Sequence, residues 1–203
     1  MGKCAHDISE LKHEGDIYII GSGATLDYWN PDFFLDKTVI GLNLIYKFFP
    51  CTYMLTHHHP IVQEAIDSGQ TVITSKHDIC LSALKEHDFS GEYYIYYHTE
   101  QGFTSVNIEE IDGVLAPAGT PVVASLQVAY KMGAKNIILV GIDGGLLDGR
   151  MNFKYYPTPT QAGHPGRVQG VIEKTANKIR EKGVGVYSMI PFVNLTLEGH
   201  KFS

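Results

Sequence analysis

The sequence predicts an α/β fold with a single Rossmann-like, mostly parallel sheet flanked by helices. Apolar, β-rich segments alternate with helical or loop segments along the chain, as in strands joined by crossover connections. The first clear segment, residues 17–21, is an unbroken apolar run that ends in a glycine-rich turn, which is typical of a buried parallel strand. A strong helix pattern spans residues 121–132, between Thr120 as N-cap and Gly133 as C-cap. The length of 203 residues fits one domain, residues 1–203.

The remaining elements follow in chain order from the same patterns. A second helix is expected at about residues 168–182, because it ends before Gly183 and leads into a last apolar run. Residues 144–167 are polar and rich in Gly, Pro and Tyr, and a connection of that length predicts a lid-like loop. Residues 89–118 resemble an insertion between strand and helix. The expected strands are residues 17–21, 38–41, 52–55, 71–74, 93–97, 136–141 and 185–188.

Composition and charge indicate which kinds of partner and which cellular compartment to expect for this protein. The net charge of −6 without clustered Lys and Arg argues against a nucleic-acid partner. Cys4, Cys51 and Cys80 show no CxxC spacing, which favours a reducing, cytoplasmic location. The charged residues 1–16 are not expected to be a signal peptide, and no run reaches the roughly 20 apolar residues of a membrane span.

The glycine-rich turn after the first apolar run is the first candidate site. Gly21 and Gly23 would let backbone N–H groups face a phosphate, and the hydroxyls of Ser22 and Thr25 would add hydrogen bonds. The alternative is an ordinary tight turn between a strand and a helix, because a GxG pattern alone is a weak signal. Leu26 stands where the dinucleotide fingerprint has its third glycine, so NAD is disfavoured.

Polar residues follow the next two strands and are expected at the same cleft. The carboxyl ends of parallel strands border one crevice, which would place Asn43 and His57 beside Ser22. The Asn43 amide offers a donor and an acceptor to a base or ribose. Three consecutive histidines, residues 57–59, suggest zinc, but neighbouring side chains point in different directions, so a solvated or capping cluster is expected and no metal site is predicted.

Two later residues carry both a functional and a structural interpretation. Thr120 begins the strong helix, where it either helps to hold an anion or simply caps the helix. Asp143 ends a buried strand at the cleft edge. It would accept a hydrogen bond from a sugar hydroxyl, coordinate Mg²⁺, or cap the turn that follows it.

The long polar loop supplies the candidates for proton transfer and for leaving-group stabilisation. His164 is the candidate general base, because histidine exchanges protons near neutral pH, although a loop histidine is also an ordinary surface residue. The hydroxyls of Tyr155 and Tyr156, together with Arg167, would bind a departing phosphate.

Several of these segments resemble known enzymes. Residues 21–26, Gly-Ser-Gly-Ala-Thr-Leu, resemble the GxGPSL turn of bacterial CMP-sialic-acid-dependent sialyltransferases (glycosyltransferase family 42) and of DUF115, or 6-hydroxymethylpterin pyrophosphokinase-like, proteins. Asn43 and Thr120 match polar positions of those transferases, residues 129–143 resemble their helix, strand and GxD ending, and residues 163–165 resemble the segment that holds their general base. The chain departs from the pattern at Ala24 and Thr25, which replace Pro and Ser, and at Ser22, which replaces an asparagine.

The resemblance implies a nucleotide-sugar-dependent, sialyltransferase-like glycosyltransferase that transfers an activated sugar to an acceptor hydroxyl. It implies a CMP-type or other nucleotide-sugar donor with no obligatory cofactor, and small transferases of this sort often form homo-oligomers. One alternative is an ATP- and Mg²⁺-dependent pyrophosphokinase-like transferase in which Asp143 holds the ion. Another is a non-catalytic nucleotide-binding module.

Overall fold

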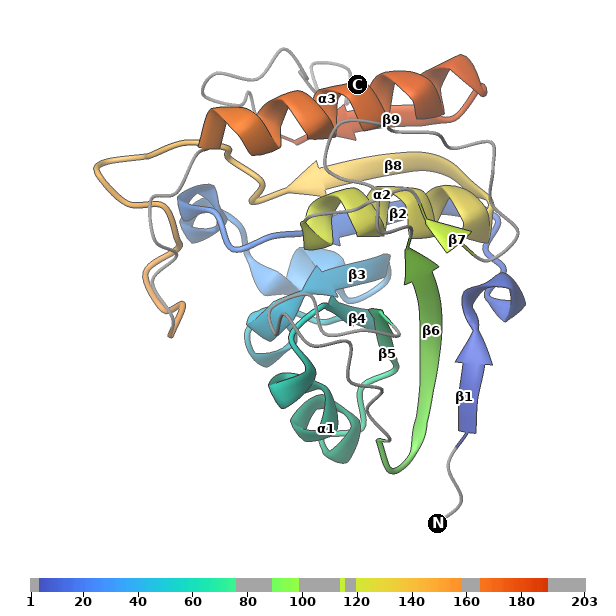
Figure 1. Ribbon diagram of the computed structural model, residues 1–203. Coiled ribbons are helices and arrows are strands. Elements are labelled where there is room, and N and C mark those ends of the chain that lie inside the picture. Colours follow the sequence, from blue (N-terminus) through green and yellow to red (C-terminus); the bar gives the residue numbers. More distant parts are fainter. Residues whose placement is uncertain (1–3, 76–88, 99–113, 116–119, 158–164, 190–203) are drawn as a thin grey trace.

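The computed structural model describes residues 4–75, 89–98, 114–115, 120–157 and 165–189. In that part of the chain, eight strands form one sheet in the order β1-β6-β5-β4-β3-β2-β8-β9, and β7 pairs with β6 outside this order. Every neighbouring pair is parallel. Figure 1 shows the sheet with α2 and α3 against it. The predicted fold class is therefore confirmed.

The seven predicted strands are all present, with ends shifted by at most two residues, and the structure adds two more. The strands are β1 (Cys4–Asp7), β2 (Gly15–Ile20), β3 (Thr38–Leu42), β4 (Tyr53–Thr56), β5 (Val72–Ser75), β6 (Glu92–His98), β7 (Val114–Leu115), β8 (Ala134–Val140) and β9 (Gly185–Ser188). Strands β1 and β7 were not predicted, because β1 reads Cys-Ala-His-Asp with no apolar run and β7 has only two residues.

Both predicted helices are confirmed, and the structure adds shorter ones. Helix α2 (Pro121–Met132) has the predicted bounds, with Thr120 accepting a hydrogen bond from the Val123 N–H at 3.3 Å. Helix α3 (Pro165–Glu181) begins three residues before its predicted start. The additional elements are α1 (His59–Asp67) and the 3₁₀ turns η1 (Ile8–Glu10), η2 (Ala24–Tyr28), η3 (Pro31–Phe34) and η4 (Asn43–Lys47).

Strand alternation divides the core between the two faces of the sheet. Ile17 and Ile19 of β2 belong to the core shared with α2 and α3. Ile20 packs on the opposite face with Phe34 and Phe153, so η2, η3, η4 and the long loop cover that face. Helix α1 adds a smaller cluster against β4 and β5. No helix among the described residues is long and apolar enough to cross a membrane.

The strand order places a topological switch point between β2 and β8. From β2 the chain runs outward through β3, β4, β5 and β6, and then returns by way of α2 to β8 on the other side of β2. The connections therefore diverge at the carboxyl ends of β2 and β8, which is where open α/β sheets form a ligand crevice. Residues 21–25 and 141–143 follow these two ends.

Candidate functional site

The turns that follow β2 and β8 pack directly against each other at the switch point. The Gly23 N–H donates to the Gly141 carbonyl oxygen at 2.7 Å. A Cβ added at Gly21 would lie 2.7 Å from that same carbonyl oxygen, and one added at Gly23 would lie 2.5 Å from the Asp143 Cγ. Gly21 is thus required by the close approach of the two backbones, and Gly23 by the Asp143 side chain that lies against it.

Asp143 caps the turn after β2. Its carboxylate accepts hydrogen bonds from the Thr25 N–H at 2.9 Å, from the Thr25 hydroxyl and from the Ala24 backbone. The side chain is buried, and this burial raises the pKa of the carboxyl group, although the hydrogen bonds from Thr25 and Ala24 oppose the shift. In this geometry Asp143 caps the turn after β2, whereas the sequence suggested a cap on the turn that follows Asp143 itself.

Four backbone N–H groups of the glycine-rich turn, those of Gly21, Gly23, Thr25 and Leu26, already have acceptors inside the protein. The Gly21 N–H donates to the Val140 carbonyl at 2.9 Å, and the Leu26 N–H donates to the Gly23 carbonyl at 3.1 Å. The N–H groups of Gly23 and Thr25 have the partners described above. A ligand at this edge of the sheet therefore meets side chains rather than a row of open N–H groups.

Four side chains meet at the carboxyl ends of β2 and β3, and we call Ser22, Asn43, Asn152 and Tyr156 the strand-end cluster. The Asn152 amide donates to the Ser22 hydroxyl oxygen at 2.7 Å. The side chains of Ser22 and Asn43 and the Leu44 backbone lie close enough to the Tyr156 hydroxyl for their interactions with it to lower its pKa. Burial raises the pKa of Tyr156 above its ordinary value of 10.0 and outweighs these interactions, so the hydroxyl is protonated at neutral pH as any tyrosine is.

Asn43 is held at this edge by its backbone and by β4. It begins η4 with φ of 54°, a left-handed conformation that asparagine adopts more readily than most residues. Its Oδ1 atom accepts a hydrogen bond from the Thr56 hydroxyl at 2.8 Å. The amide of Asn43 is therefore fixed in orientation beside Ser22 and Tyr156.

The structure separates the two tyrosines that the sequence treated alike. Tyr155 is 67% exposed, and the Lys154 ammonium lies 5.4 Å from the centre of the Tyr155 ring. Tyr156, in contrast, belongs to the strand-end cluster. Arg167 falls in the first turn of α3, and its side chain lies outside the described residues. His164 also lies outside them.

The three consecutive histidines do not form one solvated group, which corrects that expectation. His57, which directly follows β4, is buried, with its ring centre 5.7 Å from that of Tyr96. His58 is exposed. His59 is buried in the first turn of α1 with its Nε2 atom 3.1 Å from the Ser75 carbonyl oxygen. Among the described residues, no three His, Cys, Asp or Glu side chains are arranged to hold a metal ion.

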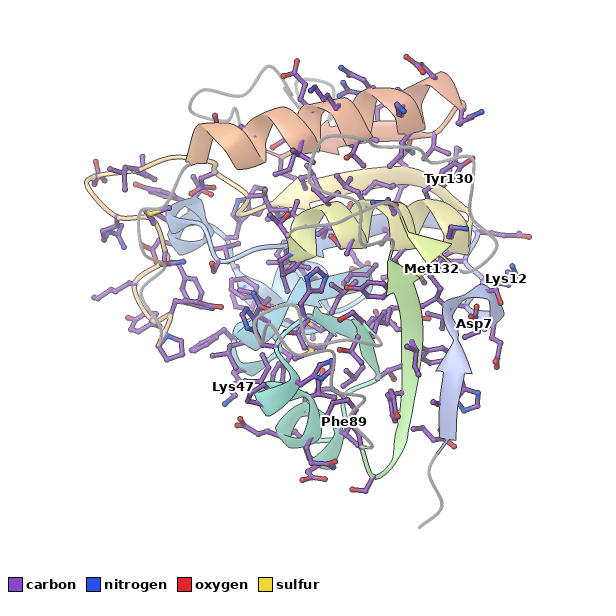
Figure 2. All side chains as sticks on the ribbon, viewed as in Figure 1. Asp7, Lys12, Lys47, Phe89, Tyr130 and Met132 are labelled. Atoms are coloured by element: carbon purple, nitrogen blue, oxygen red, sulfur yellow. The ribbon has the colours of Figure 1, made fainter. Side chains whose placement is uncertain are left out.

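Ion pairs hold two of the cations near this edge. Figure 2 shows Lys47 beside α1, where its ammonium pairs with the Glu64 carboxylate at 2.5 Å. Arg150 pairs with Asp27 at 2.5 Å. Sequence reasoning missed Asn152, Asp27 and Arg150, because no local pattern indicates which loop residue will contact a turn more than a hundred positions away.

One solved structure supports the fold by comparison. The chain is similar to the MAf glycosyltransferase from Magnetospirillum magneticum AMB-1, with a TM-score of 0.60 and 12% sequence identity. The match covers 97% of this chain and 35% of that one, so this chain spans about a third of the length of the glycosyltransferase. No family model matches the sequence, and no curated protein matches it. The chain thus shares its fold with part of a glycosyltransferase.

Proposed function

We propose that this chain binds a nucleotide-linked sugar at the strand-end cluster and takes part in transfer of the sugar to an acceptor hydroxyl. The observation that carries the proposal is the meeting of Ser22, Asn43 and Tyr156 at the carboxyl ends of β2 and β3, beside the topological switch point between β2 and β8. The fold shared with a glycosyltransferase supports the same class of chemistry. A CMP-type donor is the first candidate, on the basis of the sequence resemblance.

The cluster offers hydrogen bonds of the kind that phosphate and ribose accept. A tyrosine hydroxyl, a serine hydroxyl and an asparagine amide all donate, and the amide also accepts. These side chains take the role that the sequence first gave to the N–H groups of Gly21 and Gly23, because those groups already have protein acceptors. The turn glycines instead make room for β8 and Asp143.

The proposed reaction has a simple balance of bonds. His164, assigned from the sequence, removes the acceptor proton as the acceptor oxygen bonds to the anomeric carbon. The bond between that carbon and the phosphate oxygen breaks, and the nucleotide leaves with the electron pair. Tyr156 and Arg167 would stabilise the negative charge on the departing phosphate.

The geometry favours this chemistry over a pyrophosphokinase in which Asp143 holds Mg²⁺. Both carboxylate oxygens of Asp143 already accept hydrogen bonds from Thr25. A metal ion at Asp143 would compete with these donors for the oxygen lone pairs of the carboxylate.

A thermal-shift panel tests the proposal. CMP, CDP, UDP, GDP and ATP are each added with and without Mg²⁺, and a ligand that binds the native state raises its melting temperature. We expect one nucleotide to raise the melting temperature to the same extent in the presence of Mg²⁺ and in the presence of EDTA. Stabilisation by ATP that EDTA abolishes would instead support the pyrophosphokinase chemistry, and the absence of any nucleotide effect would refute the proposed site.

A pair of tyrosine variants locates the binding. Tyr156→Phe should weaken the nucleotide-induced shift, measured from the variant's own ligand-free melting temperature, by the equivalent of about tenfold in affinity. Tyr155→Phe removes an exposed hydroxyl one position away and should retain the shift. Equal nucleotide-induced shifts in melting temperature for the two variants would show that the Tyr156 hydroxyl does not contribute to nucleotide binding. Nucleotide binding without turnover of any sugar donor would favour the non-catalytic module.

A further inference from the structure

Part of the long loop folds back across the switch point, and we call residues 147–156 the strap. Its first four residues form a tight hairpin in which Leu147 and Arg150 exchange two backbone hydrogen bonds of 3.0 Å. Asp148 and Gly149 between them have φ of 50° and 75°, the left-handed pair of a two-residue hairpin turn. The hairpin gives the strap a defined shape before it reaches the turn after β2.

Asp27 contacts the strap on both sides of its central residues. The Oδ2 atom of Asp27 accepts from the Arg150 guanidinium at 2.5 Å, and its Oδ1 atom accepts from the Lys154 backbone N–H at 2.9 Å. Asp27 belongs to η2, directly after the glycine-rich turn. One carboxylate therefore fastens two points of the strap to the element that follows β2.

The residues between these two points pair with the glycine-rich turn itself. Asn152 forms an antiparallel bridge with Gly23, and the Phe153 N–H donates to the Ser22 carbonyl at 3.0 Å. The Phe153 ring is buried, with its centre 5.1 Å from that of Phe48 and 5.6 Å from that of Tyr156. This path delivers Asn152 and Tyr156 to the strand-end cluster.

We infer that Asp27 is a positioning residue that latches the strap and thereby holds Asn152 and Tyr156 in place for nucleotide binding. The binding half of the inference rests on the proposed function. When the strap opens, the cluster loses two of its four side chains. The apparent affinity for a nucleotide then falls in proportion to the closed fraction.

The latch acts locally rather than on the whole fold. The pair between Asp27 and Arg150 is partly exposed, and such pairs contribute little to global stability. Opening of the strap leaves the sheet and its helices in place, so it is a sub-global event. Amide hydrogen exchange within the strap is therefore the measurement that isolates it.

The experiment compares Asp27→Ala with a matched control, Asp36→Ala, in the full chain. Asp36 also forms an ion pair, with Lys37 at 3.0 Å, but it is exposed and has no contact with the strap among the described interactions. In Asp27→Ala, exchange at the N–H groups of Arg150, Phe153 and Tyr156 should accelerate by about tenfold, while Asp36→Ala exchanges as the wild type does.

Two further variants refine the result. Arg150→Met removes the ion pair and keeps the Asp27 bond to Lys154, and Asp27→Asn keeps a neutral acceptor, so both should give intermediate acceleration. The affinity for CMP, or for whichever nucleotide stabilises the wild type most, should fall in the same order as strap exchange rises. Global melting temperatures should change little across the series.

The outcomes separate the latch from the proposed function. Unchanged strap exchange in both Asp27→Ala and Arg150→Met overturns the latch. Accelerated exchange with undiminished nucleotide affinity overturns the positioning role. If the wild type binds no nucleotide, the proposed function fails, and accelerated exchange in Asp27→Ala would still support the latch.

Discussion

The Asp143 carboxylate accepts two hydrogen bonds from Thr25, one from its N–H at 2.9 Å and one from its hydroxyl, and so joins the end of β8 to the turn after β2. Two glycines allow the turns to approach this closely. A Cβ added at Gly23 would lie 2.5 Å from the Asp143 Cγ, and one added at Gly141 would lie 2.5 Å from the Leu26 Cγ. Each turn supplies a glycine that makes room for a side chain of the other. The two turns therefore stabilise the switch point as one unit.

Asp143→Ala should destabilise the protein. The substitution leaves the Thr25 N–H and hydroxyl and the Ala24 backbone without their acceptor in a buried position, at a cost of about 3 kcal/mol in the free energy of unfolding. Urea unfolding measures the change. Asp36→Ala is the control and should leave the unfolding midpoint unchanged, since it removes an exposed aspartate. A midpoint for Asp143→Ala equal to that of the control would show that the cap adds no stability.

The raised pKa of Asp143 predicts how the stability of the protein changes with pH. Burial raises the pKa of Asp143 above its usual 3.8, so between 3.8 and the raised value the folded state binds more protons than the unfolded state. The contribution of Asp143 to stability therefore increases as pH falls through that window and decreases as pH rises through it. Relative to Asp143→Ala, the wild type should gain stability as the pH is lowered from 7 toward 4. Parallel curves for the two proteins would contradict the raised pKa.

Two glycine-to-alanine substitutions should have opposite effects. Gly23 has φ of −59°, which alanine tolerates, but its Cβ would collide with the Asp143 carboxyl group, so Gly23→Ala should cost about 1–3 kcal/mol. Gly170 lies in α3 with no atom within 4 Å of an added Cβ. Gly170→Ala should therefore stabilise by about 0.5–1 kcal/mol, because glycine is a poor helix former. Thermal unfolding of both variants checks the signs, and a stable Gly23→Ala protein would argue against the tight packing of the two turns.

His164→Ala should separate catalysis from binding. If His164 is the general base, turnover with a nucleotide-sugar donor should fall by roughly 10²- to 10⁴-fold, while the thermal shift caused by the nucleotide persists. His58→Ala provides a control at an exposed histidine. Unchanged turnover in His164→Ala would assign the proton transfer to another group.

Local patterns were sufficient for most of the fold. The apolar run that becomes β2 and the capping residues Thr120 and Gly133 around α2 are read within a few positions, because backbone geometry and capping depend on near neighbours. Ser22 and Asn43 directly follow the apolar runs that become β2 and β3, and this position likewise placed them at the carboxyl edge of the sheet. The strand β1, Cys4–Asp7, was not predicted because its four residues form no apolar run, and only its pairing with β6 identifies it as a strand.

The sequence by itself determined the α/β class, the parallel strands and the edge at which polar residues gather, because these follow from periodicity and turn chemistry. Only the tertiary structure decided that Asp143 would bind Thr25, that Tyr156 rather than Tyr155 would reach Ser22 and Asn43, and that Asp27 would hold the strap. Those contacts join residues far apart in the chain. Their formation depends on how the sheet brings two turns and a loop together, and no local pattern encodes that arrangement.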